Sequence, residues 1–515
     1  MRVYNVNKAI GLASSGVEYA QRYRRQLLDG IDWVEDHYVF TDYLPTNLHV
    51  FAERLGFVDT QVHWVYDLVT GRETRPPALS VDAFLATIEQ PHAPPRRHPD
   101  HLEVALTDSA VRYRIRTTGS GLVDRVETVV GGRLTRVAHY DATLHHVEHL
   151  HDGKVVRRVF HTPDGRVGAE QLVRDREIVR TLVTPASPLY DRSVPPRRGA
   201  PSSFGGELVL EGRSGFLRFV FEHLLDRPDD VVIVDRALDV IDAIYPVIGE
   251  RRLYSVVHAE HYDLRRIEDG VLLWNNHYEH VFTRPDLVDG LIVSTHRQRE
   301  VLQAQLAARF PDRDHLVARI PVGFVDAPAA GRAVDRHALV TASRLADEKH
   351  LDVLIRAVAL AREALPELRL DIYGEGKREP LLAVIRETGT EDRVRLLGHQ
   401  RLDGVLGGYG LYVSASTSEG FGLSLLEAMA EGVPVVGFDV EYGNRELVES
   451  GANGRLVPFT RSDRDVVAFA EAIVAVLSSD SLEDMRRESL RRAEAYTAAK
   501  VRRLWERLLS GEAPC

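Results

Sequence analysis

Cysteine is almost absent from this chain of 515 residues, in which Cys515, the last residue printed, is the only one. A disulfide framework, a thiolate metal site and a catalytic cysteine in the body of the chain are therefore excluded. This sparing use of cysteine is typical of proteins of the reducing cytoplasm. We accordingly expect a cytoplasmic protein.

Long apolar runs are missing as well. No stretch reaches the roughly 20 apolar residues that a membrane-spanning helix needs, and Met1-Arg2-Val3-Tyr4-Asn5 lacks the apolar core of a signal peptide. The formal net charge of −11 gives no reason to expect a nucleic-acid partner. A G-x-G-x-x-G fingerprint is also absent, which argues against a dinucleotide-binding enzyme.

Histidine is not scarce, but its spacing predicts no metal site. Five histidines fall within one stretch that reads as strands and turns, and their spacing matches no known zinc site. We therefore expect no bound metal. These residues are His139, His145, His146, His149 and His151.

The remaining pattern changes character along the chain. Continuous apolar strands such as Val231-Val232-Ile233-Val234 indicate an α/β fold at both flanks. Short runs with glycine turns between about residues 111 and 183 indicate an inserted antiparallel meander. We predict a Rossmann-like domain over 1–47 and 206–330, the inserted β-rich domain over 48–205, a second Rossmann-like domain over 331–500, and a C-terminal helix and tail over 501–515.

The stretch from Ser416 to Val436 reads Ser-Thr-Ser-Glu-Gly-Phe-Gly-Leu-Ser-Leu-Leu-Glu-Ala-Met-Ala-Glu-Gly-Val-Pro-Val-Val. With the strand-like run before it, the stretch predicts a strand, a glycine turn, a helix and a second strand. The N-terminus of such a helix suits an anion. Glu419 either meets a ligand from the turn or caps the helix. Glu427 either serves a ligand or is a core-edge acid with a protein partner, because an unpaired carboxylate in an apolar helix is costly.

Glu419 and Glu427, in the context Glu-Gly-Phe-Gly-Leu-Ser-Leu-Leu-Glu-Ala-Met-Ala, resemble the donor-site signature of retaining glycosyltransferases of family 4. Further pieces are similar to the same family in the same order. They are Gly16, the turn Ile320-Pro321-Val322-Gly323-Phe324-Val325-Asp326, the loop Ser343-Arg344-Leu345 with Lys349, and Tyr373-Gly374-Glu375-Gly376. Val322 departs from the family, which usually has asparagine there.

The N-terminal half resembles one subgroup of that family. Its pieces are Asn5, Gly11 to Ala20, the strand-rich insertion, His258-Ala259-Glu260-His261-Tyr262 and Trp274-Asn275-Asn276-His277-Tyr278-Glu279. The subgroup contains the accessory-secretion transferases that put N-acetylglucosamine on serine-rich surface proteins, and relatives that modify ribitol-phosphate wall teichoic acid. The resemblance implies a GT-B architecture, with two Rossmann-like domains facing across a cleft and an added antiparallel β domain.

The resemblance also implies site residues. It assigns the nucleotide ribose to Glu427, the donor sugar to Glu419, and the diphosphate to Arg344 and Lys349. Residues with a predicted catalytic role are His258, Arg344, Lys349 and Glu419, and residues with a predicted substrate-binding role are Gly16, Gly374, Glu375, Phe421, Gly422, Leu423 and Glu427. The donor would be uridine-diphosphate N-acetylglucosamine, used with retention of configuration and without a cofactor or metal.

The acceptor stays open between a serine-rich protein and a wall polymer. The resemblance also leaves open a co-activator subunit, a homo-oligomer and peripheral attachment to a membrane. A third hypothesis is a catalytically silent subunit that binds glycosylated protein. Within the meander, Arg112, Arg114 and Arg116 alternate with apolar residues. They predict either a free basic stripe that selects the acceptor or a solvated face balanced by acids.

Overall fold

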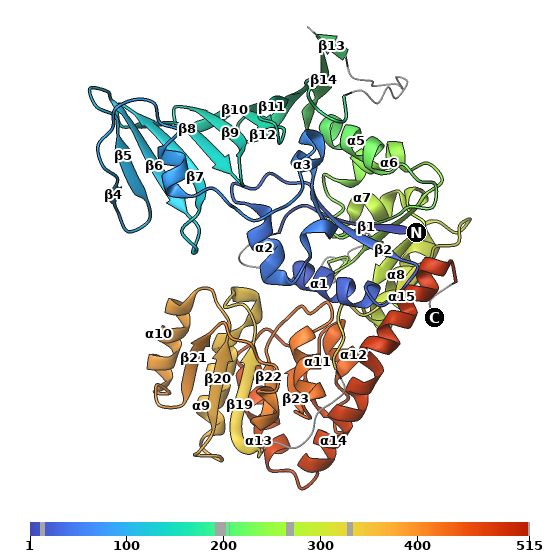
Figure 1. The fold of residues 1–515 in the computed structure, drawn as a ribbon. Helices are drawn as coiled ribbons and strands as arrows, with labels where there is room; N and C mark the ends of the chain where they lie inside the picture. Colours follow the sequence, from blue (N-terminus) through green and yellow to red (C-terminus); the bar gives the residue numbers. More distant parts are fainter. Residues whose placement is uncertain (11–15, 191–201, 205, 264–271, 327–332, 513–515) are drawn as a thin grey trace. The chain divides into compact units, whose positions relative to one another are not determined.

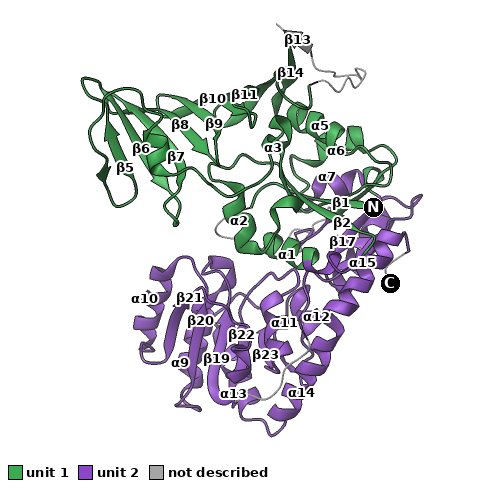
Figure 2. Ribbon diagram, viewed as in Figure 1, with its two compact units in different colours: residues 1–25, 32–255, 286–288 green, residues 26–31, 256–285, 289–515 purple. Residues whose placement is uncertain are grey.

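The computed structural model describes residues 1–10, 16–190, 202–204, 206–263, 272–326 and 333–512 (Figure 1). The chain forms two compact units (Figure 2). Unit 1 comprises Met1–Arg25, Asp32–Ser255 and Asp286–Val288, and unit 2 comprises Gln26–Ile31, Val256–Pro285 and Asp289–Cys515.

Unit 1 contains parallel strands in the order β16, β15, β1, β2, β3. Every residue of β15 is buried, as its continuous β-branched run predicts for a strand covered on both faces. The strands are β1 (Arg2–Asn7), β2 (Glu35–Phe40), β3 (Val62–Trp64), β15 (Val231–Val234) and β16 (Arg252–Val256).

Helices of unit 1 lie beside these strands. A buried ion pair ties the first of them to the sheet, because Arg24 Nη2 lies 2.7 Å from Asp235 Oδ1, directly after β15. The capping-box spacing of Ser15 and Glu18 predicts a helix start at Ser15, a residue that lies outside the described ones. The helices are α1 (Gly16–Leu28, whose last residues belong to unit 2), α2 (Leu48–Leu55), α3 (Val65–Thr70), α4 (Val81–Leu85), α5 (Gly212–Leu224) and α6 (Ile241–Ile248).

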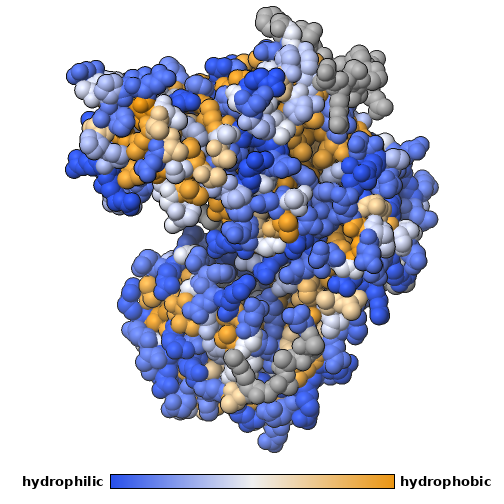
Figure 3. Space-filling model, viewed as in Figure 1, coloured by the Kyte–Doolittle hydropathy of each residue, from blue (hydrophilic) through white to orange (hydrophobic). Residues whose placement is uncertain are grey.

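An antiparallel sheet of 11 strands forms the rest of unit 1, in the order β13, β14, β12, β11, β10, β9, β8, β7, β6, β5, β4. Apolar side chains show between hydrophilic ones over this sheet (Figure 3). The meander predicted between residues 111 and 183 is confirmed. The strands are β4 (Arg96–Arg97), β5 (Leu102–Ala105), β6 (Val111–Thr117), β7 (Val123–Val130), β8 (Arg133–Tyr140), β9 (Leu144–His151), β10 (Lys154–His161), β11 (Val167–Arg174), β12 (Glu177–Val183), β13 (Ser202–Phe204) and β14 (Glu207–Glu211).

The two faces of strand β6 differ as its alternating sequence predicts. Ile115 is fully buried and packs with Phe84 of α4 in a small core. The opposite face carries Arg112, Arg114 and Arg116, in register with a neighbouring strand. The single-face placement of the three arginines is therefore confirmed.

The arginines of β6 do not form a free basic stripe. Glu103 lies 3.2 Å from Arg112 and 3.8 Å from Arg114. Arg116 pairs with Asp100 at 2.7 Å and with Glu127 at 2.5 Å. The acids of neighbouring strands and turns therefore balance this face, and the hypothesis of an unpaired stripe is wrong.

Arg72, just after α3, joins the antiparallel sheet to the rest of unit 1. Its guanidinium donates to the His161 carbonyl at 2.6 Å, to Asp141 Oδ2 at 2.7 Å and to the Leu144 carbonyl at 2.7 Å. Both Arg72 and Asp141 are buried. One side chain thus satisfies acceptors from the ends of three strands.

Unit 2 contains a second parallel sheet, in the order β21, β20, β19, β22, β23, β24. Successive residues of β19 belong to hydrophobic cores on opposite faces of the sheet. Leu339 packs against α9 and α13, and Val340 packs against α11. This alternation is what a sheet with helices on both faces requires. The strands are β19 (Asp335–Ala342), β20 (Arg369–Tyr373), β21 (Val394–Gly398), β22 (Tyr409–Ser414), β23 (Val435–Phe438) and β24 (Gly454–Val457). Strands β17 (Gly290–Val293) and β18 (Val317–Arg319) pair in parallel and follow β16 in the first sheet.

The helices of unit 2 include the C-terminal one that the sequence predicts. In α15, Arg502 Nε donates to the Leu27 carbonyl at 3.1 Å, so this helix returns to the end of α1. The helices are α7 (Glu279–Thr283), α8 (His296–Arg309), α9 (Leu351–Ala361), α10 (Arg378–Thr388), α11 (Leu423–Ala430), α12 (Gly443–Leu447), α13 (Arg464–Leu477), α14 (Leu482–Ala493) and α15 (Ala498–Ser510).

Two observations bear on the predicted domain limits. Strand β3 falls inside the range 48–205 but pairs in parallel with β2, because the chain completes the first sheet before it enters the meander. The second Rossmann-like domain was predicted to begin at residue 331, whereas unit 2 already includes Val256–Pro285 and the chain from Asp289 onward. The limits themselves stay a prediction. Among the described residues, no helix is long and apolar enough to cross a membrane.

Replacement of Arg72 by methionine tests how strongly the antiparallel sheet depends on it. We expect Arg72→Met to lower the free energy of unfolding of unit 1 by about 3–5 kcal/mol, because Asp141 is left as an unpaired buried charge. Urea denaturation followed by tryptophan fluorescence measures the change. The control is Arg166→Met, whose exposed pair with Asp164 should contribute less than about 1 kcal/mol. Equal effects of the two substitutions would contradict the expectation.

Candidate active site

The loop after β19 brings a lysine to the start of a helix. Asp347–Lys349 forms one 3-10 turn, and α9 begins two residues after Lys349. The first N–H groups of a helix lack intrahelical acceptors and carry partial positive charge. Lys349 and the N-terminus of α9 therefore concentrate positive charge at the carboxyl end of β19, as a diphosphate requires.

Arg344 in the same loop is placed differently from Lys349. Its side chain is exposed, and Nη2 pairs with Glu348 Oε1 at 2.9 Å. An exposed pair of this kind is weak. The guanidinium can therefore exchange Glu348 for a phosphate at little cost.

The loop after β20 is held against the loop after β19 by backbone hydrogen bonds. The Leu345 N–H donates to the Glu375 carbonyl at 2.8 Å, and the Lys377 N–H donates to the Leu345 carbonyl at 3.0 Å. A Cβ at Gly374 would lie 1.8 Å from the Ser343 carbonyl oxygen. Gly374 is therefore required by close packing of two backbones, while the exposed Glu375 side chain remains available to a ligand.

The turn after β22 carries Glu419 to Lys349. Glu419 Oε2 lies 2.9 Å from Lys349 Nζ, and both side chains are largely buried. The Glu419 carbonyl also accepts from the N–H groups of Tyr442 and Gly443, at 3.1 Å and 2.9 Å. Two predicted catalytic residues that are 70 positions apart in the sequence thus meet in one ion pair.

The start of α11 contains the other predicted residues of this turn. Gly422 adopts φ +89°, a left-handed conformation that glycine tolerates best. Leu423 is the first helical residue, and Glu427 follows one turn later on the same face of α11, half-buried. Phe421 is buried against Tyr496, with ring centroids 5.6 Å apart. Phe421 therefore anchors the turn through its core contact.

His258, just beyond β16, lies against the Glu419 turn. A Cβ at Gly420 would be 2.2 Å from the His258 carbonyl oxygen, so the two backbones touch. The His258 N–H also donates to the Tyr278 hydroxyl at 3.0 Å. Unit 2 therefore brings together the predicted residues His258, Lys349 and Glu419. Gly16 begins α1 in unit 1, and a Cβ there would meet nothing within 4 Å.

The two N-terminal sequence pieces that resemble the subgroup contact each other. Asn275 donates from its backbone N–H to the His261 carbonyl at 2.9 Å and from its side chain to the Glu260 carbonyl at 2.9 Å. Tyr262 and Trp274 form an antiparallel bridge. These residues therefore build one local structure next to His258.

Two tyrosines near the site, Tyr412 and Tyr442, were not predicted from the sequence. The Tyr412 hydroxyl accepts from the Ala342 N–H at 3.1 Å and lies 2.8 Å from Ser424 Oγ, so it joins the end of β19 to α11. The Tyr442 hydroxyl lies 3.2 Å from His261 Nδ1. Burial lowers the pKa of His261 to about 4, so this ring is neutral at pH 7. Sequence patterns gave no signal for these contacts, which join distant loops.

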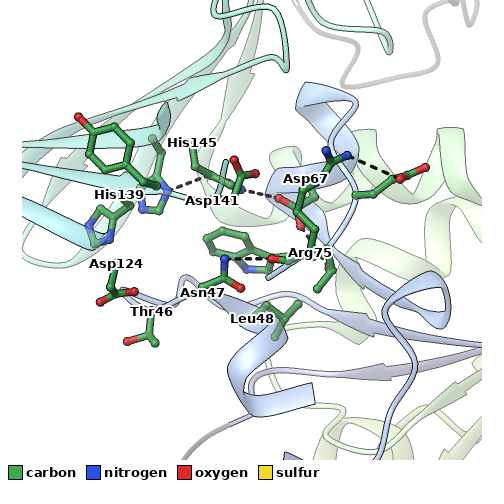
Figure 4. A pocket seen from close by; sticks show the side chains of 14 residues that line it. Thr46, Asn47, Leu48, Asp67, Arg75, Asp124, His139, Asp141 and His145 are labelled. Carbon is green, nitrogen blue, oxygen red and sulfur yellow. Dashed lines mark hydrogen bonds and ion pairs between the residues drawn. The ribbon is translucent and has the colours of Figure 1, made fainter. Parts of the chain in front are cut away.

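A separate pocket lies in unit 1, outside these loops, and holds three of the clustered histidines (Figure 4). His145 Nε2 lies 2.7 Å from Asp67 Oδ1. His146 Nε2 lies 2.8 Å from the Tyr43 hydroxyl, and His139 stacks on His146 with centroids 4.2 Å apart. Each of these histidines thus has protein partners that account for its position.

Comparison with known proteins identifies the family of these loops. The family model described as glycosyl transferases group 1 matches residues 336–479, which include the loops after β19, β20 and β22. The chain is 34% identical to the GtfA subunit of the UDP-N-acetylglucosamine–peptide N-acetylglucosaminyltransferase of Streptococcus gordonii, over 99% of this chain and 98% of that protein. It is 26% identical to the poly(ribitol-phosphate) α-N-acetylglucosaminyltransferase of Staphylococcus aureus, over 50% of each chain.

Solved structures agree with the sequence comparison. The crystal structure of the pneumococcal O-GlcNAc transferase GtfA in complex with UDP and GlcNAc matches with a TM-score of 0.89 and 33% identity, over 99% of both chains. The crystal structure of a GtfA/B complex matches with a TM-score of 0.88 and 33% identity, also over 99% of both chains. The predicted GT-B fold class is thereby confirmed, and the chain belongs to the GtfA family of glycosyltransferases.

Proposed function

We propose that this protein transfers N-acetylglucosamine from uridine-diphosphate N-acetylglucosamine to serine or threonine hydroxyls of a serine-rich surface protein, with retention of configuration. The observation that carries the proposal is the ion pair between Lys349 and Glu419 at the N-terminus of α9. The arrangement offers cationic and anionic groups side by side, which suits the diphosphate and the sugar of one donor. The relatives that match over the whole chain bear the corresponding name.

Lys349 is the proposed electrostatic catalyst. An ammonium group has three N–H donors, so the bond to Glu419 leaves two for phosphate oxygens. Negative charge develops on the leaving diphosphate, and a fixed cation at that place stabilises the transition state more than the ground state. Arg344 adds a second cation from the same loop.

Glu419 and Glu427 are the proposed donor ligands on either side of the α11 start. Glu419 accepts from hydroxyl groups of the sugar, and Glu427 accepts from those of the ribose. A charged carboxylate makes stronger hydrogen bonds than a neutral acceptor. His258, whose backbone lies against the Glu419 turn, is the proposed contact to the sugar and the acceptor. The leaving phosphate itself takes the acceptor proton, and no side chain is assigned as a general base.

A protein acceptor is favoured over a wall polymer by the extent of the likeness. The peptide-modifying relative covers 99% of this chain, whereas the ribitol-phosphate-modifying relative covers 50% at lower identity. The balanced arginine face of β6 also removes one argument for a polyphosphate acceptor. A catalytically silent role is disfavoured because Arg344, Lys349, Glu419 and Glu427 are all present.

A partner subunit is part of the proposal. A GtfA homologue of similar length has been crystallised as a GtfA/B complex. We propose that this chain likewise works with a second subunit, which presents the acceptor. The near absence of cysteine supports a cytoplasmic site of transfer. Peripheral attachment to a membrane stays a hypothesis.

The donor is tested by an assay of sugar release and transfer in excess chelator. We expect hydrolysis of, or transfer from, uridine-diphosphate N-acetylglucosamine at an unchanged rate, because Lys349 and the α9 N-terminus supply the charge that a metal would otherwise supply. Liberated uridine diphosphate is measured with and without EDTA. Activity that is lost in EDTA and restored by a divalent ion would refute the metal-free mechanism.

The acceptor is tested by direct competition. Purified protein, with and without a co-expressed partner subunit, receives equal hydroxyl concentrations of a serine-rich polypeptide and of poly(ribitol phosphate), together with labelled donor. We expect the label on the polypeptide, with mass spectrometry placing it on serine or threonine. Label found mainly on the polymer would reverse the choice of acceptor.

Steady-state kinetics distinguish the proposed roles of Lys349 and Glu427. Lys349→Ala should lower kcat by about 100-fold or more, because one electrostatic contact to the leaving group is lost. Glu427→Ala should mainly raise the KM for donor, by about 10- to 100-fold for one charged hydrogen bond. The control is Lys377→Ala, which removes a nearby exposed lysine paired with Asp347. Wild-type kinetics in folded Lys349→Ala and Glu427→Ala variants would place the site elsewhere.

A further inference from the structure

The hairpin turn between β4 and β5 places two histidines face to face. The His98 N–H donates to the His101 carbonyl at 2.8 Å, which closes the turn. The two imidazole rings stack with centroids 4.6 Å apart and planes inclined by 4°. Glu103, two residues further along β5, belongs to the same cluster, in which one ligand atom from each of the three residues lies within 4.8 Å of the others.

Both histidines of the turn have an unused ring nitrogen. His98 Nε2 and His101 Nε2 are shielded from solvent and have no hydrogen-bond partner. A buried polar atom without a partner is costly and calls for an explanation. Coordination of one ion, shared with the carboxylate of the cluster, would give these nitrogens a partner.

Asp100 prepares His101 for such a role. Asp100 Oδ1 lies 2.7 Å from His101 Nδ1 and so accepts a hydrogen bond from the Nδ1–H, which leaves the Nε2 lone pair available. Arg116 holds the other oxygen of Asp100 at 2.7 Å. A carboxylate bound to the far nitrogen is the usual partner of a metal-binding histidine, because it sets the tautomer and the ring orientation.

We propose that His98, His101 and Glu103 form a binding site for a divalent transition-metal ion of the Zn²⁺ type. Two imidazoles and a carboxylate are ligands that Zn²⁺ accepts, with the fourth position left to water. Tetrahedral bonds of about 2.0–2.1 Å put ligand atoms roughly 3.4 Å apart. The ligand atoms lie within 4.8 Å of one another, and the two imidazoles must rotate out of their parallel stack so that both ring planes contain the ion. Mg²⁺ prefers oxygen ligands and is a poor fit.

The arginines of β6 set the strength of the site. Arg112 lies 3.2 Å from Glu103 and competes with the ion for that carboxylate. Arg114 approaches Glu103 at 3.8 Å. A bound ion would therefore displace at least one arginine from Glu103 and would join β5 to the turn by coordination. Removal of an exposed arginine that competes for Glu103 should therefore strengthen metal binding, although the same substitution removes an ion pair from the metal-free protein.

This inference does not rest on the proposed transferase activity. The cluster belongs to the antiparallel sheet of unit 1, and the donor loops belong to unit 2. Donor hydrolysis should therefore be the same with the metal site filled or empty. A chelator that abolished hydrolysis would count against the metal-free mechanism and leave this site to be judged by binding alone.

Calorimetric titration with Zn²⁺ tests the site in the full-length chain, after EDTA treatment and desalting, in a Cys515→Ser background that removes the only thiol. We expect one strong site for Zn²⁺ and no corresponding site for Mg²⁺. His101→Gln, which removes a ligand, should weaken that site by more than about 100-fold, since even residues outside the coordination shell change affinity by about 10- to 100-fold. Asp100→Asn, which changes a residue outside the coordination shell, should weaken Zn²⁺ binding by about 10- to 100-fold.

Two further variants separate metal coordination from general effects. His151→Gln, at the exposed end of β9 in the same sheet, should leave Zn²⁺ affinity unchanged. Arg112→Gln should raise it, by up to about fivefold for the loss of an exposed ion pair. Hydrogen exchange should show that Zn²⁺ protects residues 96–103 in the parent chain and not in His101→Gln. No strong Zn²⁺ site, or one that persists in both His98→Gln and His101→Gln, would overturn the proposal.

Discussion

The close approach of two loop backbones at the carboxyl edge of the unit 2 sheet is the constraint on which the site depends. Gly374 lies so near the Ser343 carbonyl that a side chain there cannot fit. The resulting hydrogen bonds between the loops fix the path of residues 343–345. Lys349 follows within one short turn, so its ammonium group reaches Glu419 only when that path is kept. A backbone contact without any charge thus determines where the charged groups meet.

Charge in this protein is balanced locally and does not form broad one-sign surfaces. The arginines of β6 are paired with acids on β5, on β7 and in the turn before β5. In the loop after β19, Arg344 has a weaker charge partner, because it pairs with Glu348 at the exposed surface. Exposed pairs contribute little and exchange easily. Of the two proposed phosphate cations, Arg344 is therefore held weakly and Lys349 by a largely buried pair with Glu419, whereas the three β6 arginines share Glu103, Asp100 and Glu127.

Several elements could be predicted from residue patterns because their causes are local. The run Val231–Val234 predicts a strand covered on both faces, and β15 is buried at every position. Alternation around Ile115 predicts that Arg112, Arg114 and Arg116 share a face, as they do. Glycine turns likewise mark the meander. Strand β3 was not expected in the parallel sheet, because three residues are too short to show a period.

The sequence by itself determined the α/β class and the βαβ unit around Glu419 and Glu427, because these depend on spacing along one segment, which is visible in a linear chain. The GT-B architecture and the proposed donor residues were instead inferred from longer motifs that resemble a known family. Tertiary structure alone decided that Lys349 meets Glu419, that His258 touches the Gly420 turn, and that acids of other strands neutralise the β6 arginines. The same is true of the two histidines that stack across the β4–β5 turn. Such contacts join residues whose separation in sequence carries no periodic signal, because folding of the backbone, and not local propensity, sets their distance.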